Sequence, residues 1–156
     1  MISQHKKTAN QKQSSEGTFS VDINDNQHFN GTEVSLKYFF PEGFILDVYD
    51  ANWHNNNVLF IVENANNTGQ HLKIGADERA RAYFAFWVGG GFYRLAYADR
   101  GELTYFYNLQ TKEIHGTFWF EIDDEEGQSV AYSFTNGKFR VKELNQLVTT
   151  ATPLAP

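Results

Sequence analysis

Short segments in which apolar and polar residues alternate constrain this chain more than any other feature. Residues 18–23, "TFSVDI", place Phe19, Val21 and Ile23 on one face, and residues 33–39, "EVSLKYF", repeat the pattern. A period of two is typical of β-strands, and turn-rich stretches separate such segments along most of the chain. Because 156 residues suit one domain, we predict a single all-β domain. The expected architecture is an antiparallel β-sandwich or a closed barrel of about ten strands.

The two ends of the chain lack this alternation. Residues 1–16 are polar and contain three lysines, while residues 148–156 contain two prolines and no strand pattern. Such composition is typical of unstructured termini. We therefore predict a flexible polar leader at residues 1–16, an antiparallel β-domain at residues 17–147 and a disordered tail at residues 148–156.

Turn residues indicate several of the connections between strands. Residues 41–43, Pro-Glu-Gly, join two alternating segments, Asn136-Gly137 suits a two-residue hairpin turn, and residues 89–93, "GGGFY", suit a hairpin loop. The acidic run at residues 123–126 is interpreted as a solvated turn, because four adjacent carboxylates cannot all converge on one calcium ion. A short helical turn is expected at residues 76–82.

The composition excludes several classes of site. The chain has no Cys, so disulfides, zinc-thiolate sites and thiol nucleophiles are excluded. Its five histidines lack metal-ligand spacing, and neither a metal nor a cofactor is expected. The formal net charge of −6 disfavours nucleic acid as a partner. We expect a non-catalytic protein, with a glycan hydrolase left open on a pool of five acidic residues: Asp47, Asp50, Glu63, Asp99 and Glu121.

Aromatic residues occupy both faces of some predicted strands. In residues 82–88, "AYFAFWV", both alternate sets are apolar, and residues 103–107, "LTYFY", are similar. Such rings either close the interior or form an exposed platform for a ligand, since they combine apolar area with a polar edge. Trp119 alternates with phenylalanines and shares its face with His115 and Thr117. The candidate ligand-binding or partner-binding residues are Trp53, Tyr83, Trp87, Tyr93, Tyr105, Tyr107 and Trp119.

A longer pattern, Ile-x-Gly-Thr-Phe-x-Phe followed by Thr-Asn-Gly-x-Phe-x-Val, lies within residues 102–141. Its residues are Ile114, Gly116, Thr117, Phe118, Phe120, Thr135, Asn136, Gly137, Phe139 and Val141. The pattern resembles the C-terminal half of a family of small lipoprotein-like β-domains of unknown function from Bacteroidota. The resemblance implies an all-β domain in the periplasm or on the outer-membrane surface, held through a polar linker by a lipidated Cys. That Cys is missing here, and Met1 in its place would account for the polar leader. A cytoplasmic protein is the alternative.

These observations lead to a functional expectation. We expect a cell-envelope β-domain, a lipoprotein-type binding or accessory module that recognises a protein partner or a glycan through exposed aromatic residues. Contact with a membrane is expected only through a lipid anchor. Two alternatives stay open: a lipocalin-like barrel that binds a small apolar ligand, and a small acidic inhibitor or immunity protein.

Overall fold

The computed structural model describes residues 15–39, 43–65 and 68–143, and within these ranges it contains eleven strands and no helix. The predicted tail lies outside the described residues, as does the predicted leader except for Ser15 and Glu16. These two residues already belong to the first strand, so the β-domain begins earlier than predicted. The all-β fold is confirmed.

The strands have these bounds: β1 (Ser15–Ile23), β2 (Gln27–Asn30), β3 (Glu33–Phe39), β4 (Gly43–Asp50), β5 (Asn56–Val62), β6 (Gly69–Ile74), β7 (Ala80–Gly89), β8 (Phe92–Tyr97), β9 (Arg100–Asn108), β10 (Glu113–Asp123) and β11 (Val130–Glu143). They form one sheet in the order β2-β1-β11-β10-β9-β6-β7-β5-β4-β3, and β8 pairs with β7 off this path. All of these pairs are antiparallel except β6 and β7, which share a parallel bridge between Ile74 and Ala80. The sheet is therefore mixed, and the prediction of wholly antiparallel pairing was wrong where β6 meets β7.

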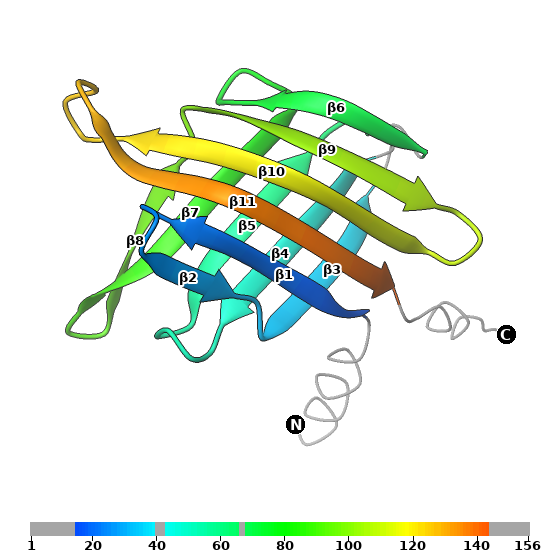
Figure 1. Cartoon of the computed structure of the whole chain (residues 1–156), viewed down its shortest axis with the longest axis horizontal. Coiled ribbons are helices and arrows are strands. Elements are labelled where there is room, and N and C mark those ends of the chain that lie inside the picture. The colour runs from blue at the N-terminus through cyan, green and yellow to red at the C-terminus, as the bar shows by residue number, and fades with distance from the viewer. Residues whose placement is uncertain (1–14, 40–42, 66–67, 144–156) are drawn as a thin grey trace, which may run out of the picture.

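The sheet curls back on itself into two layers. Figure 1 shows β2, β1, β11, β10, β9 and β6 in front of β3, β4, β5 and β7, with the strands of the two layers crossing. Strands β1 and β3, near the two ends of the sheet, approach each other. The Ser15 hydroxyl of β1 accepts a hydrogen bond from the Leu36 backbone N–H of β3 at 3.0 Å. No strand ladder joins β1 to β3 among the described residues. The result is a half-barrel, with its core between the layers.

Phenylalanines from both layers fill this core. The rings of Phe120 and Phe134 stack with centroids 4.1 Å apart, and Phe60 from the other layer meets Phe118 edge-on at 4.9 Å. All four side chains are buried. Each strand contributes alternate residues, so the period of two seen in the sequence is the direct cause of this packing. These rings fill the space between the layers, which is the space that an enclosed apolar ligand would have to occupy.

The predicted turn at Asn136-Gly137 is wrong, because both residues lie inside the fourteen-residue strand β11. Asn136 has a φ of 56°, and the pairing of β11 shifts register here against β1 and against β10. A β-bulge therefore replaces the turn. Gly137 makes room for the Phe118 ring at this point, since an added Cβ would lie 2.5 Å from its ring atoms. Pairing on both sides keeps β11 extended through residues that would suit a hairpin turn.

The other predicted connections have mixed outcomes. The hairpin predicted around residues 89–93 is confirmed, but its loop is only Gly90 and Gly91, which both have positive φ angles. The hairpin of β3 and β4 is also confirmed, although residues 40–42 of its turn lie outside the described residues. The helical turn expected at residues 76–82 was wrong, because residues 76–79 form a non-helical turn and Ala80 begins β7.

Candidate functional site

Three of the seven candidate aromatic residues belong mainly to the core. Tyr105 is only 1% exposed and packs edge-on against Phe44 at 5.2 Å, so its interpretation as an exposed contact was wrong. Its hydroxyl donates to Gln70 at 3.3 Å. Tyr107 and Trp53 are half-buried and pack against the core. Alternation along β9 places Tyr105 on the inner face together with its alternate neighbours. Because both faces of this strand are apolar in the sequence, alternation alone cannot show which set of side chains lies inside.

The other aromatic candidates lie on two opposite outer surfaces. Tyr83, Trp87 and Tyr93 share the outer face of the β7-β8 hairpin, in the rear layer of Figure 1. Trp119 lies on the outer face of the front layer, where β10 pairs with β9. A single binding surface that uses all the candidates is therefore excluded by geometry.

The outer face of the β7-β8 hairpin consists of three cross-strand pairs: Tyr83 with Tyr97, Ala85 with Leu95, and Trp87 with Tyr93. We call these six residues the aromatic face. Tyr83 and Tyr97 meet edge-on with ring centroids 5.1 Å apart. Leu95 is 54% exposed and Tyr97 is 59% exposed, and neither was among the candidates. A signal was present in the sequence "FYRLAY", which is apolar on both faces and has only one charge.

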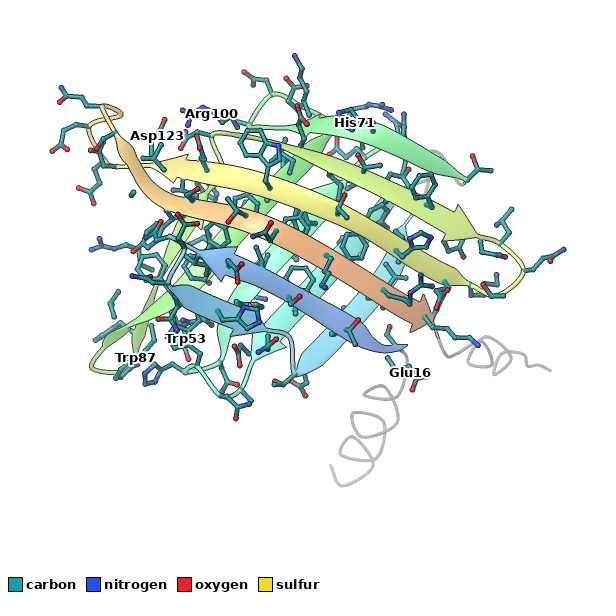
Figure 2. The ribbon with its side chains drawn as sticks, viewed as in Figure 1. Glu16, Trp53, His71, Trp87, Arg100 and Asp123 are labelled. Atoms are coloured by element: carbon teal, nitrogen blue, oxygen red, sulfur yellow. The ribbon has the colours of Figure 1, made fainter. Side chains whose placement is uncertain are left out.

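The loop that precedes β5 holds one end of the aromatic face in place. The His54 ring stacks on Trp87 with centroids 4.2 Å apart and planes 25° apart. The Trp87 backbone N–H donates to the Asn56 side chain at 2.8 Å, and the Tyr93 hydroxyl donates to the His54 carbonyl. Figure 2 shows Trp53 and Trp87 at the same end of the molecule. These contacts pre-order the indole and the phenol ring, which lowers the entropy cost of binding.

Charged and polar side chains border the aromatic face on β7 itself and on the neighbouring strands β5 and β4. Arg81 donates to Glu63 at 2.7 Å, and this hydrogen bond raises the pKa of the arginine. Asn57 donates to Asp47 at 2.6 Å. The Asp47 carboxylate, and then burial, raise the pKa of the Tyr49 phenol above its ordinary value of 10.0. The rim is therefore polar and largely self-satisfied, as is typical around an apolar contact surface.

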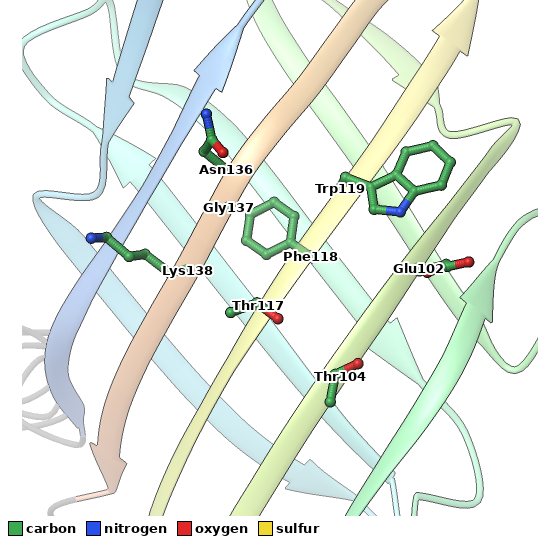
Figure 3. Close-up of a pocket in the computed structure, with 8 residues that line it drawn as sticks. All are labelled: Glu102, Thr104, Thr117, Phe118, Trp119, Asn136, Gly137 and Lys138. Carbon is green, nitrogen blue, oxygen red and sulfur yellow. The ribbon is translucent and has the colours of Figure 1, made fainter.

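A shallow hollow lies beside Trp119 on the front layer (Figure 3). Trp119 pairs with Glu102 across the β9-β10 ladder, and Thr117 pairs with Thr104 in the same ladder. Asn136 and Lys138 of the bulged strand β11 complete the polar lining, with Phe118 and Gly137 at the hollow as well. Trp119 is 36% exposed. One indole among hydroxyl, carboxylate, amide and ammonium groups provides both a stacking surface and hydrogen-bond partners.

The five acidic residues of the predicted catalytic pool have structural hydrogen bonds. Asp50 is 3% exposed and accepts hydrogen bonds from the backbone N–H groups of Asn30 at 2.9 Å and Asn52 at 3.0 Å. The other carboxylates accept from neighbours in the same way: Asp47 from Asn57, Glu63 from Arg81, Asp99 from the backbone of Asp123, and Glu121 from Arg100. No cluster of three or more His, Asp or Glu suited to a metal occurs among residues 15–39, 43–65 and 68–143.

The acidic run at residues 123–126 contributes to turn structure. Asp123 and Glu121 both bind Arg100, at 2.6 and 2.8 Å, and raise the pKa of its guanidinium. Asp124 accepts hydrogen bonds from the Ser129 hydroxyl at 2.8 Å and from the Gln128 backbone N–H at 3.0 Å. These bonds, led by that of Ser129, lower the pKa of Asp124 below its ordinary value of 3.8.

Acidification is expected to loosen this loop through Asp124. Its folded-state pKa lies below 3.8, so its stabilising contribution is complete above pH 3.8 and is lost as the pH falls through the folded-state value. An NMR titration of the Gln128 amide shift should therefore have its midpoint below pH 3.8. In Asp124→Ala this transition should vanish. A midpoint in the wild type at or above 3.8 would contradict the assignment.

No protein-family model matches this sequence, and no curated protein or solved structure is significantly similar to it. The likeness to Bacteroidota lipoprotein-like domains therefore stays a prediction. In the described part of the chain, no helix has the length and apolarity that a membrane span requires. The geometry of the two surfaces carries the functional inference.

Proposed function

We propose that this protein is a non-catalytic binding module that recognises a protein partner through the aromatic face. One observation carries the proposal: a single hairpin exposes Trp87, Tyr93, Leu95 and Tyr97 on this face, with Tyr97 59% exposed. Contiguous apolar surface of this kind is rare on soluble monomers and typical of interaction sites. Tyrosine and tryptophan are also enriched among the residues that contribute most to protein-protein affinity.

A protein partner fits this surface better than a small ligand does. The aromatic face is the outer side of a two-stranded ladder, whereas small-molecule sites are concave and enclose most of the ligand. The phenylalanine core lies where a lipocalin-like ligand would have to bind, which supports an external surface instead. The net charge of −6 favours a basic partner, as would suit an acidic inhibitor or immunity protein.

The hollow at Trp119 supports a second candidate function, which is glycan binding. Its indole is accessible, and Glu102, Thr104 and Lys138 provide the donors and acceptors that sugar hydroxyls require.

We also propose that the protein is located at the cell envelope, with a lipid anchor as its only contact with a membrane. The support for this location is the resemblance of residues 102–141 to lipoprotein-like domains.

Substitutions on the two surfaces distinguish these functions. The protein, purified from its source and immobilised, should carry a bound protein partner with it. The double substitution Trp87→Ser and Tyr97→Ser should weaken that interaction at least about 30-fold, as truncation of interface hot spots does. Surface plasmon resonance with the purified partner measures the change. Leu109→Ser is the matched control, because Leu109 is similarly exposed at 52% but lies in the loop between β9 and β10.

The same variants decide between the candidates. Undiminished binding by the Trp87 and Tyr97 double variant would contradict recognition through the aromatic face. Loss of binding only in Trp119→Ala would assign recognition of the partner to the hollow instead. Melting temperatures should stay within a few degrees of the wild type, since all three side chains are at least one-third exposed.

A further inference from the structure

Strand β8 forms an edge of the sheet that lacks the usual protection. Within the described residues it pairs only with β7, and Figure 1 places this hairpin at the border of the molecule. Edge strands are normally guarded by short length, charged side chains, proline or a covering segment. The edge strand β2 has only four residues, three of them polar and exposed, and β3 lies against β1. In β8 the only charged residue is Arg94, which lies 3.7 Å from Glu125.

The backbone of β8 presents hydrogen-bonding groups to this free edge. The Ala98 N–H donates to the Ala82 carbonyl at 2.9 Å, which sets the phase of the ladder with β7. Because bonded and non-bonded pairs alternate in an antiparallel ladder, Ala96 and Arg94 also bond toward β7. The backbone groups of Tyr93, Leu95 and Tyr97 therefore point away from it. The Trp87 backbone N–H fits this alternation, because it points away from its β8 neighbour Tyr93 and donates to the Asn56 side chain.

Charge selects one register for pairing of this edge with a second copy. Among the two-fold registers with matching faces, the two that overlap most of β8 place either Leu95 or Arg94 opposite its own copy. The Arg94 register sets two like charges directly opposite each other, which is destabilising. The Leu95 register sets Leu95 against Leu95, Tyr93 against Tyr97, and Arg94 against the small Ala96. It also brings together the residues whose backbone groups are directed to the edge.

We propose that the protein forms a symmetric homodimer through antiparallel pairing of β8, with Leu95 of each copy facing the other. Edge pairing buries the backbones of the two strands and the flanks of Tyr93, Leu95 and Tyr97, while their outer faces stay open. The buried area therefore lies below about 1,200 Å², in the range of weak complexes, and the dimer is reversible. It goes beyond partner recognition, because it uses the strand edge and joins two aromatic faces into one surface.

Opposite charges at position 95 test both the dimer and its register. At about 100 µM, where a micromolar dimer is populated, light scattering after size exclusion should give the wild type twice its 17.9 kDa chain mass. Leu95→Lys alone and Leu95→Glu alone should each give the monomer mass, since like charges then face each other. An equimolar mixture of the two should recover the dimer. Leu109→Lys, at a similarly exposed leucine outside β8, should remain dimeric.

Each contrary result overturns the proposal. A monomeric wild type excludes the dimer, a Leu95→Lys protein that stays dimeric excludes this edge, and a mixture that stays monomeric excludes the register. Far-UV circular dichroism establishes that both charge variants are folded. Failure of the dimer leaves the proposed partner recognition standing, because Trp87 and Tyr97 are tested with a separate ligand. Failure of partner recognition equally leaves the mass measurement unaffected.

Discussion

Phe120→Ala should lower the free energy of unfolding by about 3–5 kcal/mol, as truncation of a buried phenylalanine does in other cores. Phe120 is fully buried at the centre of the phenylalanine cluster. Its ring stacks on Phe134 at 4.1 Å and meets Phe60 of the opposite layer edge-on at 5.9 Å. The substitution therefore removes a contact within one layer and a contact between layers. The surrounding rings belong to strands paired on both sides, so they cannot collapse fully into the cavity.

Urea denaturation monitored by circular dichroism measures this loss. Phe106→Ala is the matched control, because Phe106 is 54% exposed and stacks on the outward His115 ring at 5.4 Å. That change should cost less than about 1 kcal/mol, in line with surface substitutions. Equal losses for Phe106 and Phe120 would show that the two layers are not held together as described.

Gly116→Ala should destabilise the protein by about 3 kcal/mol, at the upper end of the usual cost of overpacking. An added Cβ would lie 2.3 Å from the Thr104 carbonyl oxygen and 3.0 Å from the Tyr105 Cα. Both are backbone atoms of β9, and they can move away only if the β9-β10 ladder opens. The Phe139 ring, 2.9 Å away, blocks the remaining direction.

Two nearby substitutions serve as comparisons for Gly116→Ala. Thr117→Ala changes an outward-facing side chain on the same strand and should alter the melting temperature little. Gly137→Ala should have an intermediate effect, because the obstructing atoms belong to the Phe118 ring, and Phe118→Leu should partly restore stability. A Gly116→Ala protein that melts with the wild type would contradict the close approach of β9 and β10.

The residues shared with the lipoprotein-like pattern serve architecture in this structure. Ile114, Phe118 and Phe120 face the core, and Gly116 allows the close approach of β9. On β11, Phe139 and Val141 also face the core, Gly137 makes room for a ring, and Asn136 forms the bulge. Such residues explain why a pattern can indicate a fold without indicating an activity.

Local alternation in the sequence was sufficient to predict the faces of some strands. In β10 it correctly assigned Phe118, Phe120 and Ile122 to the core and Trp119 to the outside, because polar residues mark the outer face. It failed in β9, where Tyr105 is buried and Phe106 is exposed, because both faces are apolar. It did not single out Leu95 or Tyr97 either, because both faces of residues 92–97 are apolar and only the structure shows which face is covered.

The sequence by itself determined that this chain forms short strands in one all-β domain without a cysteine site, since period, turn residues and composition are local properties. The tertiary structure alone decided which apolar face is solvent-exposed, that Asn136-Gly137 forms a bulge, and that Trp87 and Trp119 lie on opposite surfaces. The physical reason is that burial and strand pairing depend on residues far apart in the chain. A period of two fixes which side chains share a face, and only neighbouring strands decide what that face meets.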